Sequence, residues 1–127
     1  MQLAKLFSTK GILMGWGVTM TLLGIYMMLQ PQFVVAYYSL TPQDATGWSA
    51  LSGNFAALIT VLGLSAMLGV TLRNSTWLLN AILIEVIILM GRFIAFMNYG
   101  ITESVLILIT AEVFIGVVML KHLFKYK

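Results

Sequence analysis

The sequence contains no cysteine, and only 9% of its 127 residues are charged. Without cysteine the chain has no disulfide framework, no thiolate metal site and no redox thiol. So few charged side chains are untypical of a soluble domain, where they cover much of the surface. With 61% hydrophobic residues and a mean hydropathy of +1.00, the composition instead predicts an integral membrane protein.

Histidine is scarce too, since His122 is the single one and stands in the basic C-terminal tail. We expect it at the membrane interface beyond the last span, which excludes a bis-histidine haem and argues against a metal centre. The sequence shows no nucleophile–base pair and no phosphate-binding loop, so we expect no enzymatic activity and no cofactor. The net charge of +3 comes largely from the two ends, which favours contact with membrane lipid over binding of nucleic acid.

Long apolar runs fill most of the chain. A helix of about 20 apolar residues crosses a bilayer, and a chain of this length has room for about four of them. Gln30-Pro31 ends the first run, Arg73-Asn74-Ser75 the second and an Asn98-Tyr99-Gly100 turn the third. The prediction is an all-α integral membrane four-helix bundle, one domain over residues 1–127, with spans at about 11–29, 48–72, 77–97 and 101–120.

The basic residues outside these spans predict the orientation. Segments 30–47 and 98–100 contain no lysine or arginine, whereas the other flanks carry Lys5, Lys10, Arg73, Lys121, Lys125 and Lys127. The positive-inside rule then places both termini in the cytoplasm. Segment 30–47 faces outward and begins with a fairly apolar stretch, so it either lies on the membrane surface as a connector or folds over the bundle mouth as a lid.

Three ionisable residues, Glu85, Arg92 and Glu112, fall within the predicted spans. An isolated charge in hydrocarbon is costly, so these groups must pair or line a wet cavity. At 100° per residue, Glu85 and Arg92 share one face of the third span. Arg92 and Glu112 start about 7 Å apart in depth and lean toward each other, because helical side chains tilt toward their own N-terminus. Glu85 leans away, toward the cytoplasmic half, so we expect it to be protonated or to face water.

Each span carries a stripe of polar or small residues suited to the interior of a bundle. On the second span the stripe contains Asn54 and Ser65, and on the first it contains Gly15, Thr19 and Tyr26. Pairs of small residues also recur four positions apart, a spacing that lets neighbouring helices approach closely. These pairs are Gly11/Gly15, Ser65/Gly69 and Gly91/Ala95.

Three hypotheses account for the charged residues. Arg92 and Glu112 form an interhelical pair that fixes the packing of the last two spans. Alternatively, Arg92, Asn54 and Tyr26 form the donor wall of an outward-facing pocket, with Glu112 behind the guanidinium, suited to a carboxylate, phosphate or carbonyl-bearing ligand. In the third hypothesis, Glu85 and Glu112 form a proton relay.

The order of these features resembles an uncharacterised family of four-span bacterial membrane proteins, known as a domain of unknown function and distantly similar to DoxX-like proteins. The resemblance rests on the Leu29-Gln30-Pro31 stop, Gly53 in the second span, Gly91-Arg92, Gly100 and Glu112. It implies a multi-pass protein of the bacterial inner membrane, with no established activity. The chain departs from the family at Ala50, Leu51 and Ser52, where an arginine and a tyrosine commonly precede the glycine.

The leading functional hypothesis is a small non-enzymatic inner-membrane bundle that serves as an accessory or assembly subunit of a larger membrane complex, with a partner membrane protein or a second copy of itself. The alternative is a pocket protein or small transporter for an amphipathic or anionic ligand anchored by Arg92. A quinone-linked role follows only by analogy with DoxX-like proteins.

Overall fold

The computed structural model describes residues 8–100 and 102–126, and within them every regular element is helical. Lys5, Lys127 and the first residue of the predicted fourth span lie outside the described residues. The elements are α2 (Thr9–Leu29), α3 (Pro31–Tyr38), α4 (Ala45–Ala50), the π-helical turn η1 (Leu51–Phe55), α5 (Ala56–Thr71), α6 (Ser75–Tyr99), α7 (Glu103–Leu123) and the 3₁₀ turn η2 (Phe124–Tyr126).

Polar side chains cap the helices and fix where they begin. Ser8 Oγ accepts a hydrogen bond from the Gly11 amide at the start of α2, and Asp44 Oδ1 accepts one from the Gly47 amide at the start of α4. Asn74 caps α6 and Thr102 caps α7 in the same way. These side chains satisfy amide groups that the first helical turn leaves without a partner.

Four helical stretches are long and apolar enough to cross a membrane: Thr9–Leu29, Ala45–Thr71, Ser75–Tyr99 and Glu103–Tyr126. The second stretch joins α4, η1 and α5 into one continuous helix. The predicted all-α class is therefore confirmed, and four long apolar helices stand where the four spans were predicted, with shifts of a few residues at their ends. Their length and composition are those of a multi-pass membrane protein.

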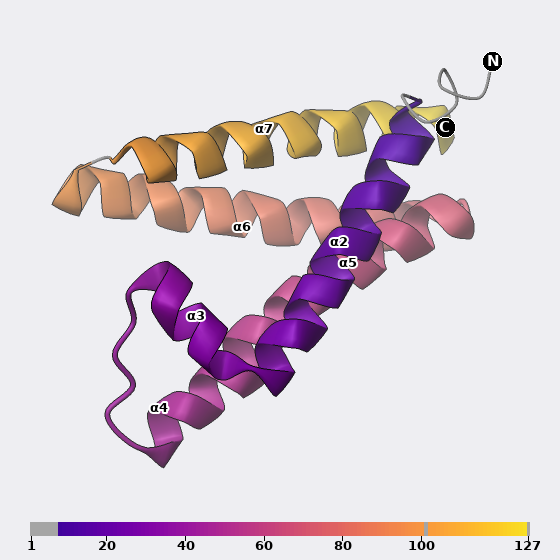
Figure 1. Ribbon diagram of the computed structural model, residues 1–127. Coiled ribbons are helices and arrows are strands. Elements are labelled where there is room, and N and C mark those ends of the chain that lie inside the picture. Colours follow the sequence, from indigo (N-terminus) through magenta and orange to yellow (C-terminus); the bar gives the residue numbers. More distant parts are fainter. Residues whose placement is uncertain (1–7, 101, 127) are drawn as a thin grey trace.

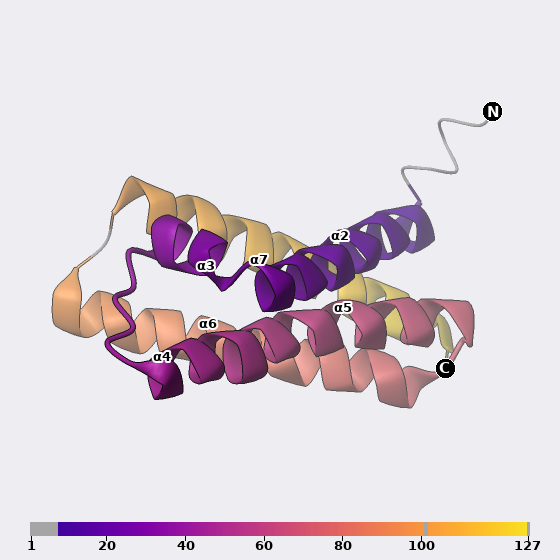
Figure 2. The same cartoon turned by 60° about the horizontal axis from the view of Figure 1, so that its bottom comes forward.

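The four long helices form two antiparallel pairs, α2 with α5 and α6 with α7 (Figure 1). The pairs meet at one end, where the start of α2, the α5–α6 turn and the end of α7 come together, and diverge toward the other (Figures 1 and 2). We call these the closed end and the open end. The predicted four-helix bundle is thus a wedge, packed as a bundle in its closed half only.

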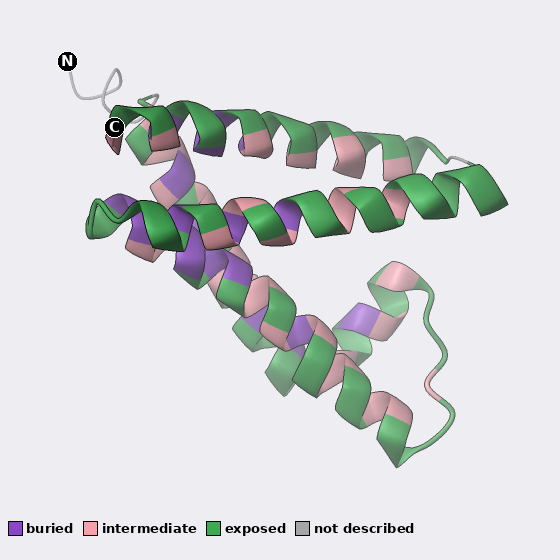
Figure 3. Ribbon diagram, turned by 180° about the vertical axis from the view of Figure 1, so that it is seen from behind, coloured by how far each residue is buried: buried purple, intermediate pink, exposed green. Residues whose placement is uncertain are grey.

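The main hydrophobic core lies in the closed half, where buried residues of all four long helices gather (Figure 3). Its members are Leu13, Leu62, Ala66, Val70, Leu78, Ala81, Ile115, Val118 and Met119. The hydrogen bond from Asn80 Nδ2 to Ser65 Oγ, 2.8 Å long, ties α6 to α5 in the same region. The burial of apolar surface therefore joins the two pairs at this end and leaves the other end open.

Glycines set the close approach of α2 to α5. A Cβ at Gly63 would lie 2.6 Å from the Gly17 carbonyl oxygen, and a Cβ at Gly24 would lie 2.6 Å from the Thr60 amide nitrogen. The predicted contact through Gly11/Gly15 is wrong, because Gly15 faces open space. The rest of the predicted interior stripe on this helix, Thr19 and Tyr26, is exposed as well. Gly17 and Gly24 are two turns apart, on the face that does pack against α5.

Helix α3 packs on the α2–α5 pair at the open end. Pro31 starts it, where proline is tolerated because the first helical amide has no helical acceptor. Val34 is fully buried against Met27 of α2 and Ala56 of α5, in a second small core. Helix α3 folds back into the space between the pairs (Figure 1), as the lid alternative for segment 30–47 requires, and its place relative to the membrane surface stays a prediction.

Candidate binding site between the helix pairs

A cavity of about 670 Å³ lies between the two helix pairs. All four long helices line it, and α3 and η1 contribute to its wall. Volumes of this size, with a mainly apolar lining and a few polar groups, are typical of sites for small molecules. The polar groups here include the three intramembrane ionisable residues, Glu85, Arg92 and Glu112.

Arg92 and Glu112 form the predicted ion pair across α6 and α7. Arg92 Nε donates to both oxygens of the Glu112 carboxylate, at 2.9 and 2.7 Å, and Nη2 donates to Oε1 at 2.6 Å. The two side chains are 23% and 17% exposed, so most of each is removed from water. Charge-assisted hydrogen bonds of this length are strong, and they hold the guanidinium in one orientation.

Glu85 is the unpaired member of the three. Its side chain is only 2% exposed, and its Oε1 atom is buried without a hydrogen-bond partner among the described residues. A buried oxygen left unsatisfied costs roughly 1 to 3 kcal/mol, and an ionised carboxylate costs more. The wall of the cavity therefore contains a buried carboxyl group that has one unsatisfied oxygen atom.

The charged groups lie at two levels of the cavity. Glu85 and Arg92 are seven residues apart on α6, which separates them by about 10 Å along the helix axis. Because α6 starts at the closed end, Glu85 lies at the inner end of the cavity and the Arg92–Glu112 pair lies nearer the mouth. A molecule that enters from the open end passes the neutralised pair before it reaches Glu85.

Aromatic side chains form the wall opposite α6 and α7. Neighbouring rings of Phe33, Tyr37, Tyr38 and Phe55 lie in contact, with centroids 6.0, 4.9 and 5.1 Å apart in that order. All four line the cavity, and so does Trp16 of α2. Burial raises the pKa of the Tyr38 phenol, which therefore stays protonated and available as a hydrogen-bond donor.

Two predicted members of the donor wall are not in the site. Asn54 is exposed and does not line the cavity, because it lies in the π-helical turn η1. There the Ala56 amide bonds to the Leu51 carbonyl, and this wider turn shifts the residues before it out of the α-helical phase used for the prediction. Tyr26 is 49% exposed and stands edge-on against Phe33, on the outside of α2. The predicted wall of Arg92, Asn54 and Tyr26 is therefore wrong.

The sequence did carry a signal for the residues that replace them. The stretch from Phe33 to Tyr38 is apolar and rich in aromatic side chains although it lies outside the predicted spans. An apolar segment that is too short to cross the membrane needs another surface to cover it. Here that surface is the cavity, and α3 supplies three of its aromatic residues, Phe33, Tyr37 and Tyr38.

The closed end is held by a polar network that the sequence did not indicate. His122 belongs to α7 and is only 6% exposed, so the prediction that it lies in a tail beyond the last span is wrong. The Tyr126 hydroxyl donates to the Gly69 carbonyl at 3.1 Å and lies 2.9 Å from His122 Nε2. On the other side of the ring, Nδ1 lies 3.1 Å from Thr9 Oγ1, which also accepts from Lys125 Nζ.

This network fixes a hydrogen on His122 Nε2. A carbonyl only accepts, so the Tyr126 hydroxyl donates its hydrogen to Gly69 and must accept from Nε2. Thr9 Oγ1 accepts from Lys125 Nζ and lies within hydrogen-bond distance of Nδ1 on the other side of the ring. Residues of α2, the end of α5, α7 and η2 are thereby linked at the point from which the two pairs diverge.

The chain matches no family model, and neither a curated protein nor a solved structure shows detectable similarity to it. The site is therefore characterised by its own geometry: a cavity with aromatic and aliphatic walls, an ion pair near the mouth and a buried carboxyl group at the inner end.

Proposed function

We propose that this chain is a small, non-enzymatic membrane protein that binds an amphipathic molecule in the cavity between its two helix pairs. The observation that carries the proposal is the combination of mainly apolar walls with the charged groups Glu85, Arg92 and Glu112 in one cavity. An amphipathic ligand matches both, since its apolar body contacts the walls and its polar head reaches the charged groups.

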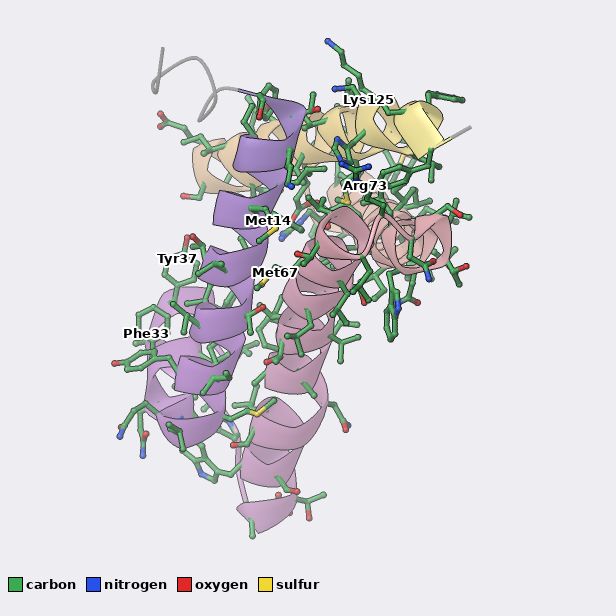
Figure 4. All side chains as sticks on the ribbon, turned by 90° about the vertical axis from the view of Figure 1, so that its right-hand side faces the viewer. Met14, Phe33, Tyr37, Met67, Arg73 and Lys125 are labelled. Atoms are coloured by element: carbon green, nitrogen blue, oxygen red, sulfur yellow. The ribbon has the colours of Figure 1, made fainter. Side chains whose placement is uncertain are left out.

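We place the closed end in the cytoplasm of a bacterial cell, with the protein in the inner membrane and the cavity mouth toward the outer side. Four basic residues support this orientation, because Lys10, Arg73, Lys121 and Lys125 all lie at the closed end. Figure 4 shows two of them, Arg73 and Lys125, at that end. The bacterial inner membrane itself rests on the resemblance to the uncharacterised family of four-span bacterial proteins, which stays a prediction.

A retained-ligand experiment tests the binding proposal. Gly91 lines the cavity, and a Cβ there meets nothing within 4 Å, so Gly91→Phe fills the cavity with little strain on its neighbours. Gly116 offers a matched control, because a Cβ there also meets nothing within 4 Å and the residue does not line the cavity. Native mass spectrometry after mild extraction should show a bound amphiphile on the wild type and on Gly116→Phe, and much less on Gly91→Phe. Equal retention by all three proteins would refute the proposal.

A role as accessory subunit is the second candidate, and a different surface favours it. A hollow of about 440 Å³ lies on the face of α6 and α7 away from the cavity, and only apolar residues line it, among them Met90, Phe93 and Val113. Side chains of a partner helix would fit such a hollow within the bilayer. This candidate predicts a stoichiometric partner protein or a second copy in the same native mass spectra, whereas a monomer with a bound small molecule would count against it.

A further inference from the structure

The ionisable groups in the cavity do not all pair with one another. Two carboxyl groups, Glu85 and Glu112, share it with one guanidinium, that of Arg92. Arg92 is committed to Glu112 by three hydrogen bonds, so this pair is neutral as a unit. Glu85 is left as the group that a ligand must complement.

The position of Glu85 indicates what that ligand must offer. Its carboxyl group is buried with Oε1 unpartnered, and among the described residues Arg92 is the one basic residue that lines the cavity. A phosphate or carboxylate head would place a second acidic group beside Glu85, at a level where Arg92 is about 10 Å away along the helix. A positive group instead supplies the countercharge that stabilises the ionised form of Glu85.

The aromatic wall favours the same kind of group. Trp16, Phe33, Tyr37, Tyr38 and Phe55 present ring systems to the cavity. The faces of aromatic rings attract cations, most strongly when both are removed from water, and tryptophan is the best partner. Trp16 is 13 residues from the outer end of α2, which puts it about 20 Å deep, in the inner part of the cavity with Glu85.

We propose that the cavity takes a lipophilic monovalent cation, with its positive charge beside Glu85 and its apolar groups against the aromatic wall. This inference rests on the proposed function, because it names the class of amphipathic molecule that the cavity binds. Glu85 is the specificity-determining residue, and Arg92 with Glu112 forms a neutral part of the wall.

Two probes of the same shape and opposite charge test the inference. Tetraphenylphosphonium and tetraphenylborate differ chiefly in the sign of their charge, and binding of each to the purified protein in detergent can be measured by equilibrium dialysis. The wild type should bind the phosphonium at least about tenfold more tightly than the borate, which corresponds to about 1.4 kcal/mol.

Substitutions at Glu85 separate charge from fold. Glu85→Gln keeps the shape and removes the charge, and it should weaken phosphonium binding on the order of tenfold. Glu85→Asp keeps the charge and should retain the preference for the phosphonium. Glu103→Gln is the matched control, because Glu103 is an exposed carboxylate at the start of α7, and its binding should equal that of the wild type. Helicity measured by circular dichroism checks that each variant is folded.

The possible failures are distinguishable. Unchanged phosphonium binding in Glu85→Gln, or a wild type that prefers the borate, would overturn the inference. If the wild type still retains an amphiphile that Gly91→Phe loses, the binding function stands while the cation is wrong. If Gly91→Phe also retains the amphiphile as the wild type does, both proposals fail together.

Discussion

Replacing Arg92 with methionine and Glu112 with leucine should destabilise each single variant more than the double variant. The ion pair joins α6 to α7 at the level where the two pairs have begun to diverge. Removing one partner of a buried pair typically costs 3 to 5 kcal/mol. Here the side chains are 23% and 17% exposed and line a cavity that water can enter. We therefore expect a smaller loss, about 2 to 4 kcal/mol for each single variant.

The two single variants should not be equal. Arg92→Met leaves two carboxyl groups in the cavity, Glu85 and Glu112, and each of them can take up a proton and become neutral. Glu112→Leu leaves a guanidinium that cannot lose its proton, with the carboxyl group of Glu85 about 10 Å away along the helix. Glu112→Leu should therefore be the less stable of the two, and the double variant should recover at least about 1.5 kcal/mol relative to the sum of the single losses.

Equilibrium unfolding in mixed micelles with increasing dodecyl sulfate, followed by circular dichroism, measures these free energies. The reasoning is refuted if the double variant loses the sum of the two single losses, because the residues would then act independently. An Arg92→Met variant less stable than Glu112→Leu would contradict this account of the charges in the cavity.

Two further substitutions test the packing of the wedge, each with a matched control and the same unfolding assay. Gly24→Leu should lower the free energy of unfolding by at least about 2 kcal/mol, because even its Cβ would meet the backbone of α5. Gly15 faces open space, so Gly15→Leu should be neutral or slightly stabilising. Equal losses in the two variants would argue against the close α2–α5 contact. Tyr126→Phe should lower the free energy of unfolding by about 1 kcal/mol, because it removes the hydrogen bond to the Gly69 carbonyl. The control Tyr99→Phe changes a residue that is 90% exposed and should have little effect. If the two tyrosine variants are equally stable, the closed-end network contributes nothing measurable.

The spans and the Arg92–Glu112 pair could be predicted from the sequence because they depend on local geometry. The length of an apolar run gives the span, and helical rise with the tilt of side chains gives the level at which two residues meet. Neighbouring antiparallel helices joined by a short turn, as α6 and α7 are through Gly100, leave few alternatives for such a pair.

The wedge could not be predicted, because it depends on which faces of non-adjacent helices meet. Gly17, Gly24 and Gly63 bring α2 and α5 together, yet glycines at other positions have similar helical spacing. Asn54 lies on a different face of its helix from the one predicted, because the π-helical turn changes the helical phase there. The pattern of apolar residues gives no signal for such a turn. The aromatic wall also required a tertiary contact, since α3 lines the cavity only because it packs on Met27 and Ala56.

The divergence of the two helix pairs in a lipid bilayer is the central claim, because the cavity and its ligand depend on it. Nitroxide labels can be placed specifically, since the chain has no native cysteine. Double electron–electron resonance in liposomes should give a clearly longer distance between labels at Leu29 and Met97, at the open end, than between labels at Lys10 and Lys121, at the closed end. Similar distances at the two ends would mean that the helices close into a parallel-sided bundle, which would contradict the wedge and remove the cavity.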